Sequence, residues 1–234
     1  MKIIPYIVLF LLMLLQSFSY AQEKKEEDLF NRATKYFFQK KFEMAEVLFQ
    51  EVIKKEPENA LAYSYLGDIY LKKQQYDGAL NLYLKAIDIN PDIAENYFRL
   101  GQIYYFKKNA DLALENFNKA LVKDEKLKVT FYHIGLTHLM LLRNKEKTIE
   151  NWETYIKLVP EDPQYDSIKR VIELLKDPKF QLPSADSKIS IEEALLLGGS
   201  TLDSQDRTIE NQKADHESKK SKDTIEDIYM DDDL

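Results

Sequence analysis

Residues 60–93 read ALAYSYLGDIYLKKQQYDGALNLYLKAIDINPDI, and this stretch of 34 residues has a similar stretch on either side of it. Glu26–Asn59 and Ala94–Leu127 have the same length and align with it without gaps. Self-similarity at a period of about 20–50 residues is typical of repeat proteins, in which each unit buries its apolar face against its neighbours. The period therefore predicts an array of stacked units.

The three copies carry the same kind of residue at the positions that pack. Small residues occupy positions 8 and 20, and aromatic residues occupy positions 11 and 24. At these four positions the copies read Ala33, Gly67 and Gly101; Ala45, Ala79 and Ala113; Tyr36, Tyr70 and Tyr104; Phe49, Tyr83 and Phe117. Small side chains let two helices approach closely, and the rings fill the space between repeats. Pro57 and Pro91 end two copies, because proline cannot continue a helix.

This pattern resembles the tetratricopeptide-repeat family, whose consensus has a bulky residue, Leu-Gly, Tyr, Ala, Phe and Pro at these places. The resemblance implies an all-α fold, a right-handed superhelix (α-solenoid) of about four helical hairpins with a C-terminal capping helix. It predicts a domain at residues 22–178, with repeats at 26–59, 60–93, 94–127 and 128–161 and the capping helix at 163–176.

The fourth copy departs from the consensus. Ile134 and Gly135 keep their places, but one extra residue is needed before Thr148 falls where an alanine belongs. Trp152 and Tyr155 then stand where the consensus has smaller residues. Their size indicates looser packing between the two helices, as expected of an end repeat that meets a cap.

The first 21 residues have the composition of a secretory signal peptide. Lys2 supplies a positive charge, Ile3–Leu15 is almost entirely apolar, and Ser19 and Ala21 supply the small residues of a cleavage site. The sequence thus predicts an exported protein, periplasmic or secreted. The alternative is an uncleaved segment that anchors a structural envelope protein to the inner membrane, although the apolar run is shorter than the ~20 residues that a spanning helix needs.

Residues 179–234 carry 14 acidic and 7 basic residues and few aromatic ones, which predicts a mostly disordered tail. Two segments interrupt it. Ile189–Leu197 is predicted to form a short amphipathic helix that Ser190 caps and Gly198-Gly199 ends. Ile225–Leu234 mixes acidic and apolar residues, as linear docking motifs do.

The resemblance also implies a binding groove, because in this family the first helix of each hairpin lines the concave face. Large apolar residues at these positions, if exposed, mark an interaction site. The groove residues are then Phe30, Thr34, Phe37, Phe38, Asp68, Leu71, Phe98, Gln102, Tyr105, Phe106, Tyr132, Leu136, Leu139 and Met140. We expect them to bind an apolar or amphipathic segment of a partner protein. Alternatively, the cap, a neighbouring repeat or the tail segment 189–197 of the same or another chain covers them.

One mode of binding is not expected. Family members that hold chaperone C-termini clamp the terminal carboxylate with Lys, Asn and Arg side chains. The matching places here are Phe30, Thr34, Tyr65, Glu95 and Arg99. Of these residues Arg99 alone fits the clamp, and Glu95 would repel a carboxylate.

The sequence offers little for catalysis. The absence of cysteine excludes disulfides, thiolate metal sites and cysteine nucleophiles. His133 and His138 would lie about 140° apart on a helix, which disfavours a shared metal ion. No catalytic triad, zinc-protease or phosphate-loop pattern is present in the sequence. We therefore expect no enzyme activity, no metal and no cofactor. Nor do we expect nucleic-acid binding, because the basic pairs stand at helix ends and make no continuous basic footprint.

Overall fold

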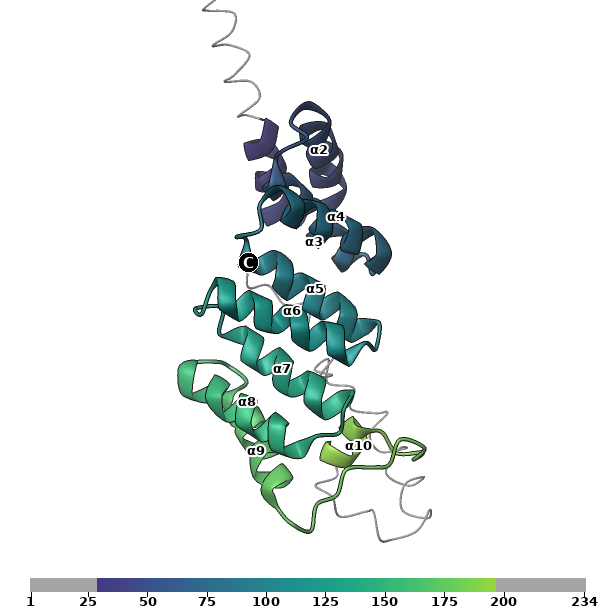
Figure 1. Cartoon of the computed structure of the whole chain (residues 1–234), viewed down its shortest axis with the longest axis vertical. Coiled ribbons are helices and arrows are strands. Elements are labelled where there is room, and N and C mark those ends of the chain that lie inside the picture. Colours follow the sequence, from purple (N-terminus) through teal and green to yellow (C-terminus); the bar gives the residue numbers. More distant parts are fainter. Residues whose placement is uncertain (1–28, 197–234) are drawn as a thin grey trace, which may run out of the picture. The chain divides into compact units, whose positions relative to one another are not determined.

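The computed structural model describes residues 29–196, and the regular secondary structure within this range is α-helical (Figure 1). A first helix includes residues 29–38. The later helices are α2 (Phe42–Lys55), α3 (Ala60–Lys72), α4 (Tyr76–Ile89), α5 (Ala94–Phe106), α6 (Ala110–Lys123), α7 (Val129–Met140), α8 (Lys145–Leu158), α9 (Tyr165–Lys176) and α10 (Ile191–Leu196). The predicted all-α fold is confirmed. The predicted signal peptide and the segment Ile225–Leu234 lie outside the described residues.

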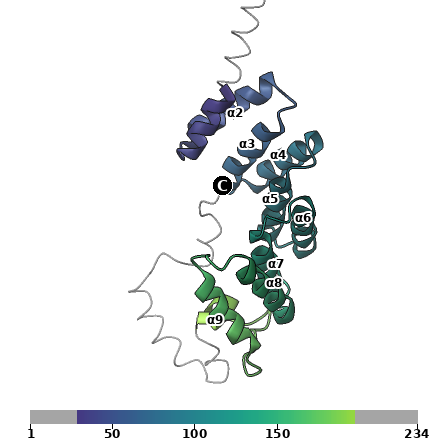
Figure 2. The same ribbon diagram turned by 90° about the vertical axis from the view of Figure 1, so that its left-hand side faces the viewer.

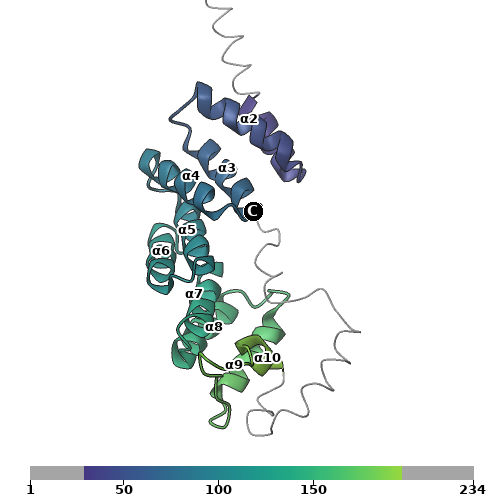
Figure 3. The same ribbon diagram turned by 90° about the vertical axis from the view of Figure 1, so that its right-hand side faces the viewer.

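The helices form two compact units that divide within α5, between Arg99 and Leu100. In the first unit, α2 packs on α3, and α3 forms a hairpin with α4 (Figure 2). In the second unit, α6 packs on α7, α7 forms a hairpin with α8, and α9 packs on α8 (Figure 3). The helices therefore pack as hairpins on neighbouring hairpins within each unit.

A glycine at position 8 lets the two helices of a hairpin come together. A Cβ atom on Gly67 would lie 2.9 Å from the ring of Tyr83, and one on Gly101 would lie 2.4 Å from the ring of Phe117. Real Cβ atoms do not approach a neighbour so closely, so these sites require glycine or a shift of the ring. Tyr83 and Phe117 have no exposed surface at all. The predicted role of the small residues at position 8 is confirmed at these sites.

The fourth hairpin is tightly packed, so the expectation of looser packing is wrong. Trp152 is only 4% exposed, and its ring stacks on Tyr132 at a centroid distance of 5.6 Å. Its indole N–H donates a hydrogen bond to the backbone carbonyl of Tyr132 at 2.9 Å. A Cβ on Gly135 would lie 2.4 Å from this indole. The larger side chain fits because the glycine opposite it leaves room for the ring.

Each turn inside a hairpin contains one residue in the left-handed conformation. These residues are Lys40, Gln74, Lys108 and Arg143, with φ between 52° and 59°. In the first three turns a backbone N–H bonds to the carbonyl five residues earlier: Lys41 to Tyr36, Gln75 to Tyr70 and Asn109 to Tyr104. In the fourth turn the N–H of Asn144 bonds to His138, six residues earlier. The extra residue of the fourth copy therefore lies in the turn between α7 and α8, ahead of Thr148 as predicted.

Helix α9 is the predicted capping helix, and it buries Ile168, Ile172 and Leu175. The chain continues to pack after it, because Phe180, Ile191 and Ala194 are at most 4% exposed. The prediction of a disordered tail is thus wrong for residues 179–188, whereas the short helix predicted at Ile189–Leu197 with a Ser190 cap is confirmed by α10. Apolar side chains spaced along residues 179–196 are buried within the second unit, although the polar composition of this segment is typical of a disordered chain.

Candidate protein-binding surface

Several residues assigned to an exposed groove are buried in the first unit. Phe37 is 5% exposed because its ring lies between those of Phe42 and Tyr65, at centroid distances of 5.7 and 5.1 Å. Leu71 and Asp68 are 6% and 8% exposed. The expectation that these side chains line an open groove is therefore wrong. The cause is the aromatic content of neighbouring helices, whose rings fill the space beside Phe37.

The same correction applies to most of the assigned residues from α5 and α7. The buried residues are Phe98, Gln102, Tyr105, Tyr132, Leu136 and Leu139, each at most 8% exposed. Phe98 lies beneath the guanidinium group of Arg99, which is 5.6 Å from the ring centre. Tyr132 is covered by the indole of Trp152. Phe106 and Met140 are half-buried. These side chains serve mainly as core rather than as an open apolar face.

An open apolar surface remains on the first unit. Phe38 is 58% exposed and Leu61 is 48% exposed. Tyr65 joins them, because its ring centre lies 6.2 Å from that of Phe38 and it follows Leu61 by one helical turn on α3. Phe30 and Thr34 precede Phe38 by two turns and one turn and are half-buried. We call these five residues the Phe38 face.

Sequence reasoning identified part of the Phe38 face. Phe30, Thr34, Phe38 and Leu61 occupy positions that line the groove in this family. Tyr65 stands at a position of the carboxylate clamp, where it does not fit, and not at a groove position. An interval of four residues from Leu61 places the two side chains on one face of a helix, and this spacing was available in the sequence.

A buried polar network lies beside the Phe38 face. The Asp68 carboxylate accepts a hydrogen bond from the hydroxyl of Tyr83 at 2.6 Å and lies 2.9 Å from Nε of Arg99. The side chains of Arg99 and Asp68 are 18% and 11% exposed. Residues of α3, α4 and α5 are thus joined through one carboxylate. Arg99, the one residue that fits a carboxylate clamp, is bound to Asp68 instead.

Burial and the Asp68 carboxylate raise the pKa of two tyrosines. Burial and the negative charge of Asp68 raise the pKa of Tyr83 well above its ordinary value of 10.0. Burial and Asp68 also raise the pKa of Tyr65. Both phenols therefore remain protonated at neutral pH, so that Tyr83 can donate its hydrogen bond to Asp68.

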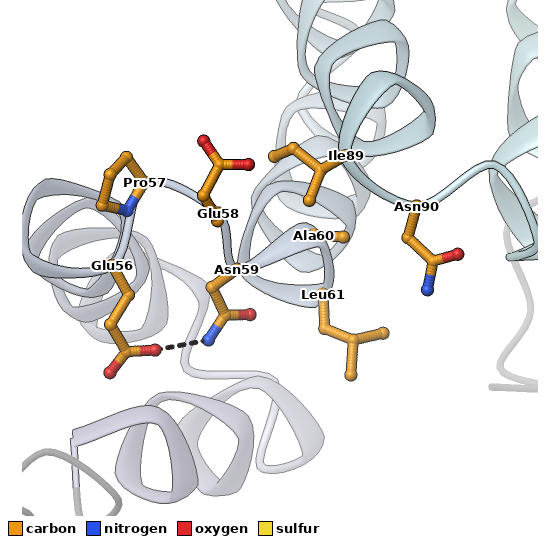
Figure 4. A pocket seen from close by; sticks show the side chains of 8 residues that line it. All are labelled: Glu56, Pro57, Glu58, Asn59, Ala60, Leu61, Ile89 and Asn90. Atoms are coloured by element: carbon orange, nitrogen blue, oxygen red, sulfur yellow. Dashed lines mark hydrogen bonds between the residues drawn. The ribbon is translucent and has the colours of Figure 1, made fainter.

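A shallow hollow of about 550 Å³ lies where α2 connects to α3 (Figure 4). It is lined by Glu56, Pro57, Glu58, Asn59, Ala60, Leu61, Ile89 and Asn90. The side-chain amide of Asn59 donates a hydrogen bond to Glu56 at 2.8 Å, while its carbonyl caps α3 by accepting from Ala62. The polar groups of Asn59 thus hold the turn itself, and Leu61 connects the hollow with the Phe38 face.

The two histidines of α7 lie in different surroundings. His133 is buried and stacks on Phe117 at a centroid distance of 5.6 Å. Burial, and secondarily the charge of Lys147, lower the pKa of His138. No group of three metal-ligating side chains occurs within residues 29–196. Within the same range, none of the helices combines the length and apolar character needed to cross a membrane.

Comparisons with known proteins connect this geometry with a family. A model described as "TPR repeat" matches residues 67–109, and a model described as "Tetratricopeptide repeat" matches residues 48–81. A comparison with curated protein sequences found no match.

Several solved structures resemble the fold. A MamA protein is 19% identical, with 64% of this chain and 82% of that chain covered at a TM-score of 0.56. A MamA RS-1 double mutant is also 19% identical, with 66% of this chain and 86% of that chain covered at a TM-score of 0.58. PilF of Pseudomonas aeruginosa is 17% identical, with 65% of this chain and 69% of that chain covered at a TM-score of 0.58. At such identities the likeness concerns the fold.

Proposed function

The chain belongs to the tetratricopeptide-repeat family, and we propose that it is a non-catalytic scaffold that binds an apolar or amphipathic segment of a partner protein. This proposal rests on the exposure of the Phe38 and Leu61 side chains. Both side chains belong to a continuous apolar face, whereas most other groove positions are buried. Large exposed aromatic residues contribute strongly to protein interfaces, because they bury much area with few rotatable bonds.

The chemistry of the Phe38 face favours an apolar occupant. Arg99 and Asp68 neutralise each other beside it, so neither presents an unpaired charge to a ligand. An amphipathic helix that lays its apolar side on Phe38, Tyr65 and Leu61 would match the spacing of residues on two neighbouring helices. We expect such a segment rather than a terminal carboxylate.

The scaffold is further proposed to act outside the cytoplasm, either in the periplasm or after secretion. The composition of residues 1–21 supports export, and the inner-membrane anchor remains the alternative. Mass spectrometry of the N-terminus in the native host distinguishes them. A chain that starts at Gln22 indicates cleavage, whereas one that starts at Met1 indicates an anchor.

A photo-reactive residue at Phe38 of the full chain should cross-link in the native host to one apolar segment of a single protein. The same residue at Leu84, which is 46% exposed on α4 of the same unit, is the matched control. A synthetic peptide of the captured segment should then bind the Phe38→Ser, Leu61→Ser double variant at least about tenfold more weakly, because interface hot spots contribute about 2 kcal/mol or more.

Equal cross-linking at Phe38 and Leu84 would contradict the assignment of this face. So would a peptide affinity that the double variant leaves unchanged. Both replaced side chains are exposed, so the double variant should keep its helicity, and circular dichroism verifies this.

A further inference from the structure

The segment after the capping helix is attached to the turn between α7 and α8. Lys145 donates a hydrogen bond from Nζ to the backbone carbonyl of Phe180 at 2.7 Å, and its ammonium group lies 5.5 Å from the centre of the Phe180 ring. Arg143 donates from Nε to the backbone carbonyl of Pro183 at 3.2 Å. Two cations of one turn thus bind two carbonyl groups three residues apart. Hydrogen bonds from charged donors are stronger than neutral ones.

The bound residues are also buried. Phe180 is 3% exposed, and Pro183 is buried beside it. A cation above an aromatic face adds electrostatic attraction to this burial. The α7–α8 turn therefore recognises an extended segment by one ring, one proline and two backbone carbonyls.

This turn differs from the other described turns inside hairpins. It contains the extra residue of the fourth copy, and Arg143 is its left-handed residue. The first residue of the following helix is Lys145, whereas the equivalent residues of α2, α4 and α6 are Phe42, Tyr76 and Ala110. Among these four turns, a cation at the first position of the following helix is thus particular to the fourth one.

Helix α10 depends on packing for its existence. It has six residues, and isolated helices shorter than about 12 residues are marginal in water. Ser190 and Glu193 form a reciprocal capping box, with bonds of 3.1 Å from the N–H of Glu193 and 3.0 Å from the N–H of Ser190. Ile191 and Ala194 are 4% and 2% exposed.

We propose that the α7–α8 turn is a docking site for an extended segment with an aromatic residue and a proline three positions later. The chain's own residues 180–183 occupy this site and hold α10 in place within the second unit. Phe180, Ile191 and Ala194 are buried, so the segment's apolar side chains lie against other parts of the second unit. Release of residues 180–183 therefore uncovers those parts together with the apolar side of α10.

Hydrogen exchange of the full chain tests the attachment. Phe180→Ala and Lys145→Met each remove one side of the contact, and Lys145→Met keeps most of the apolar stem. Both should raise the exchange rate of the α10 amides by about tenfold or more, because exchange there follows local opening. Lys179→Met is the matched control, since Lys179 is exposed next to Phe180 and its replacement should leave α10 unchanged.

Two exchange results would overturn the proposal. One is an unchanged exchange rate in α10 of both variants. The other is an equal loss of protection in α8 and α9, which would make Phe180 an ordinary core residue of the cap. Because the Phe38 face lies in the other unit, failure of this inference is distinguishable from failure of the proposed function.

A peptide of residues 178–196 provides a second test. It should bind the full-length Phe180→Ala variant at least tenfold more tightly than the wild type, in which the chain's own segment competes. Equal binding to both, or none to either, would refute an exchangeable docking site. Sedimentation identifies which segment occupies the site. A monomeric wild type supports occupation by the chain's own residues 180–183. A wild-type dimer that dissociates on Phe180→Ala would assign the site to a second copy and overturn the intramolecular contact.

Discussion

Replacement of Trp152 by alanine should lower the free energy of unfolding by about 4 kcal/mol, the usual cost of removing a buried aromatic side chain. The indole is 4% exposed, stacks on Tyr132 and donates a hydrogen bond to that residue's carbonyl. The glycine at position 135 cannot fill the space that the indole leaves, because it has no side chain. A large cavity between α7 and α8 should therefore remain.

Denaturant unfolding followed by circular dichroism measures this loss. In the wild type, fluorescence of Trp152 follows the second unit selectively, because the chain contains a single tryptophan. Val122→Ala is the control, since Val122 is 85% exposed in the same unit and should change stability by less than about 0.5 kcal/mol. A loss below about 1 kcal/mol for Trp152→Ala would show that the hairpin repacks, and would contradict the tight packing described above.

Asp68→Ala should lower the free energy of unfolding by about 3 kcal/mol. The substitution leaves the guanidinium of Arg99 and the hydroxyl of Tyr83 without their carboxylate, and removal of one partner from a buried ion pair costs about 3–5 kcal/mol. We expect the lower end of this energy range, because the Arg99 side chain is 18% exposed and can reach water. The loss should appear in the first unit, before the Trp152 fluorescence changes.

Asp88→Ala is the matched control for Asp68→Ala. Asp88 forms an ion pair with Lys85 at 3.0 Å on α4, but its side chain is 73% exposed. Exposed pairs contribute about 0–1 kcal/mol, so this variant should be close to the wild type. Equal losses for the two aspartates would mean that burial of the Asp68 network adds nothing to stability.

The hairpin architecture was predictable because packing positions recur at a constant spacing. Gly67 and Gly101 mark where helices meet, and the structure places the rings of Tyr83 and Phe117 against them. The extra residue in the fourth copy was also predictable, since Thr148 falls one place late. These features depend on contacts inside one hairpin, where helical periodicity determines which side chains face each other.

The binding surface was predictable only in part. Phe37 and Phe38 are adjacent, and position alone assigns both to the concave face. The structure buries Phe37 among aromatic rings and leaves Phe38 58% exposed. This difference arises from the bulk of side chains on neighbouring helices, which a pattern within one repeat does not contain.

The amino-acid order alone thus determined the hairpins, their close crossings and the capping helix, because these follow from local periodicity and from residue size. Tertiary packing decided which aromatic side chains stay exposed and that Arg99 binds Asp68. It also decided that residues 180–183 attach to the α7–α8 turn. Those outcomes depend on competition among distant side chains for the same space and the same polar partners. The side chains that become buried are those that fill the available space and form hydrogen bonds with all of their polar groups.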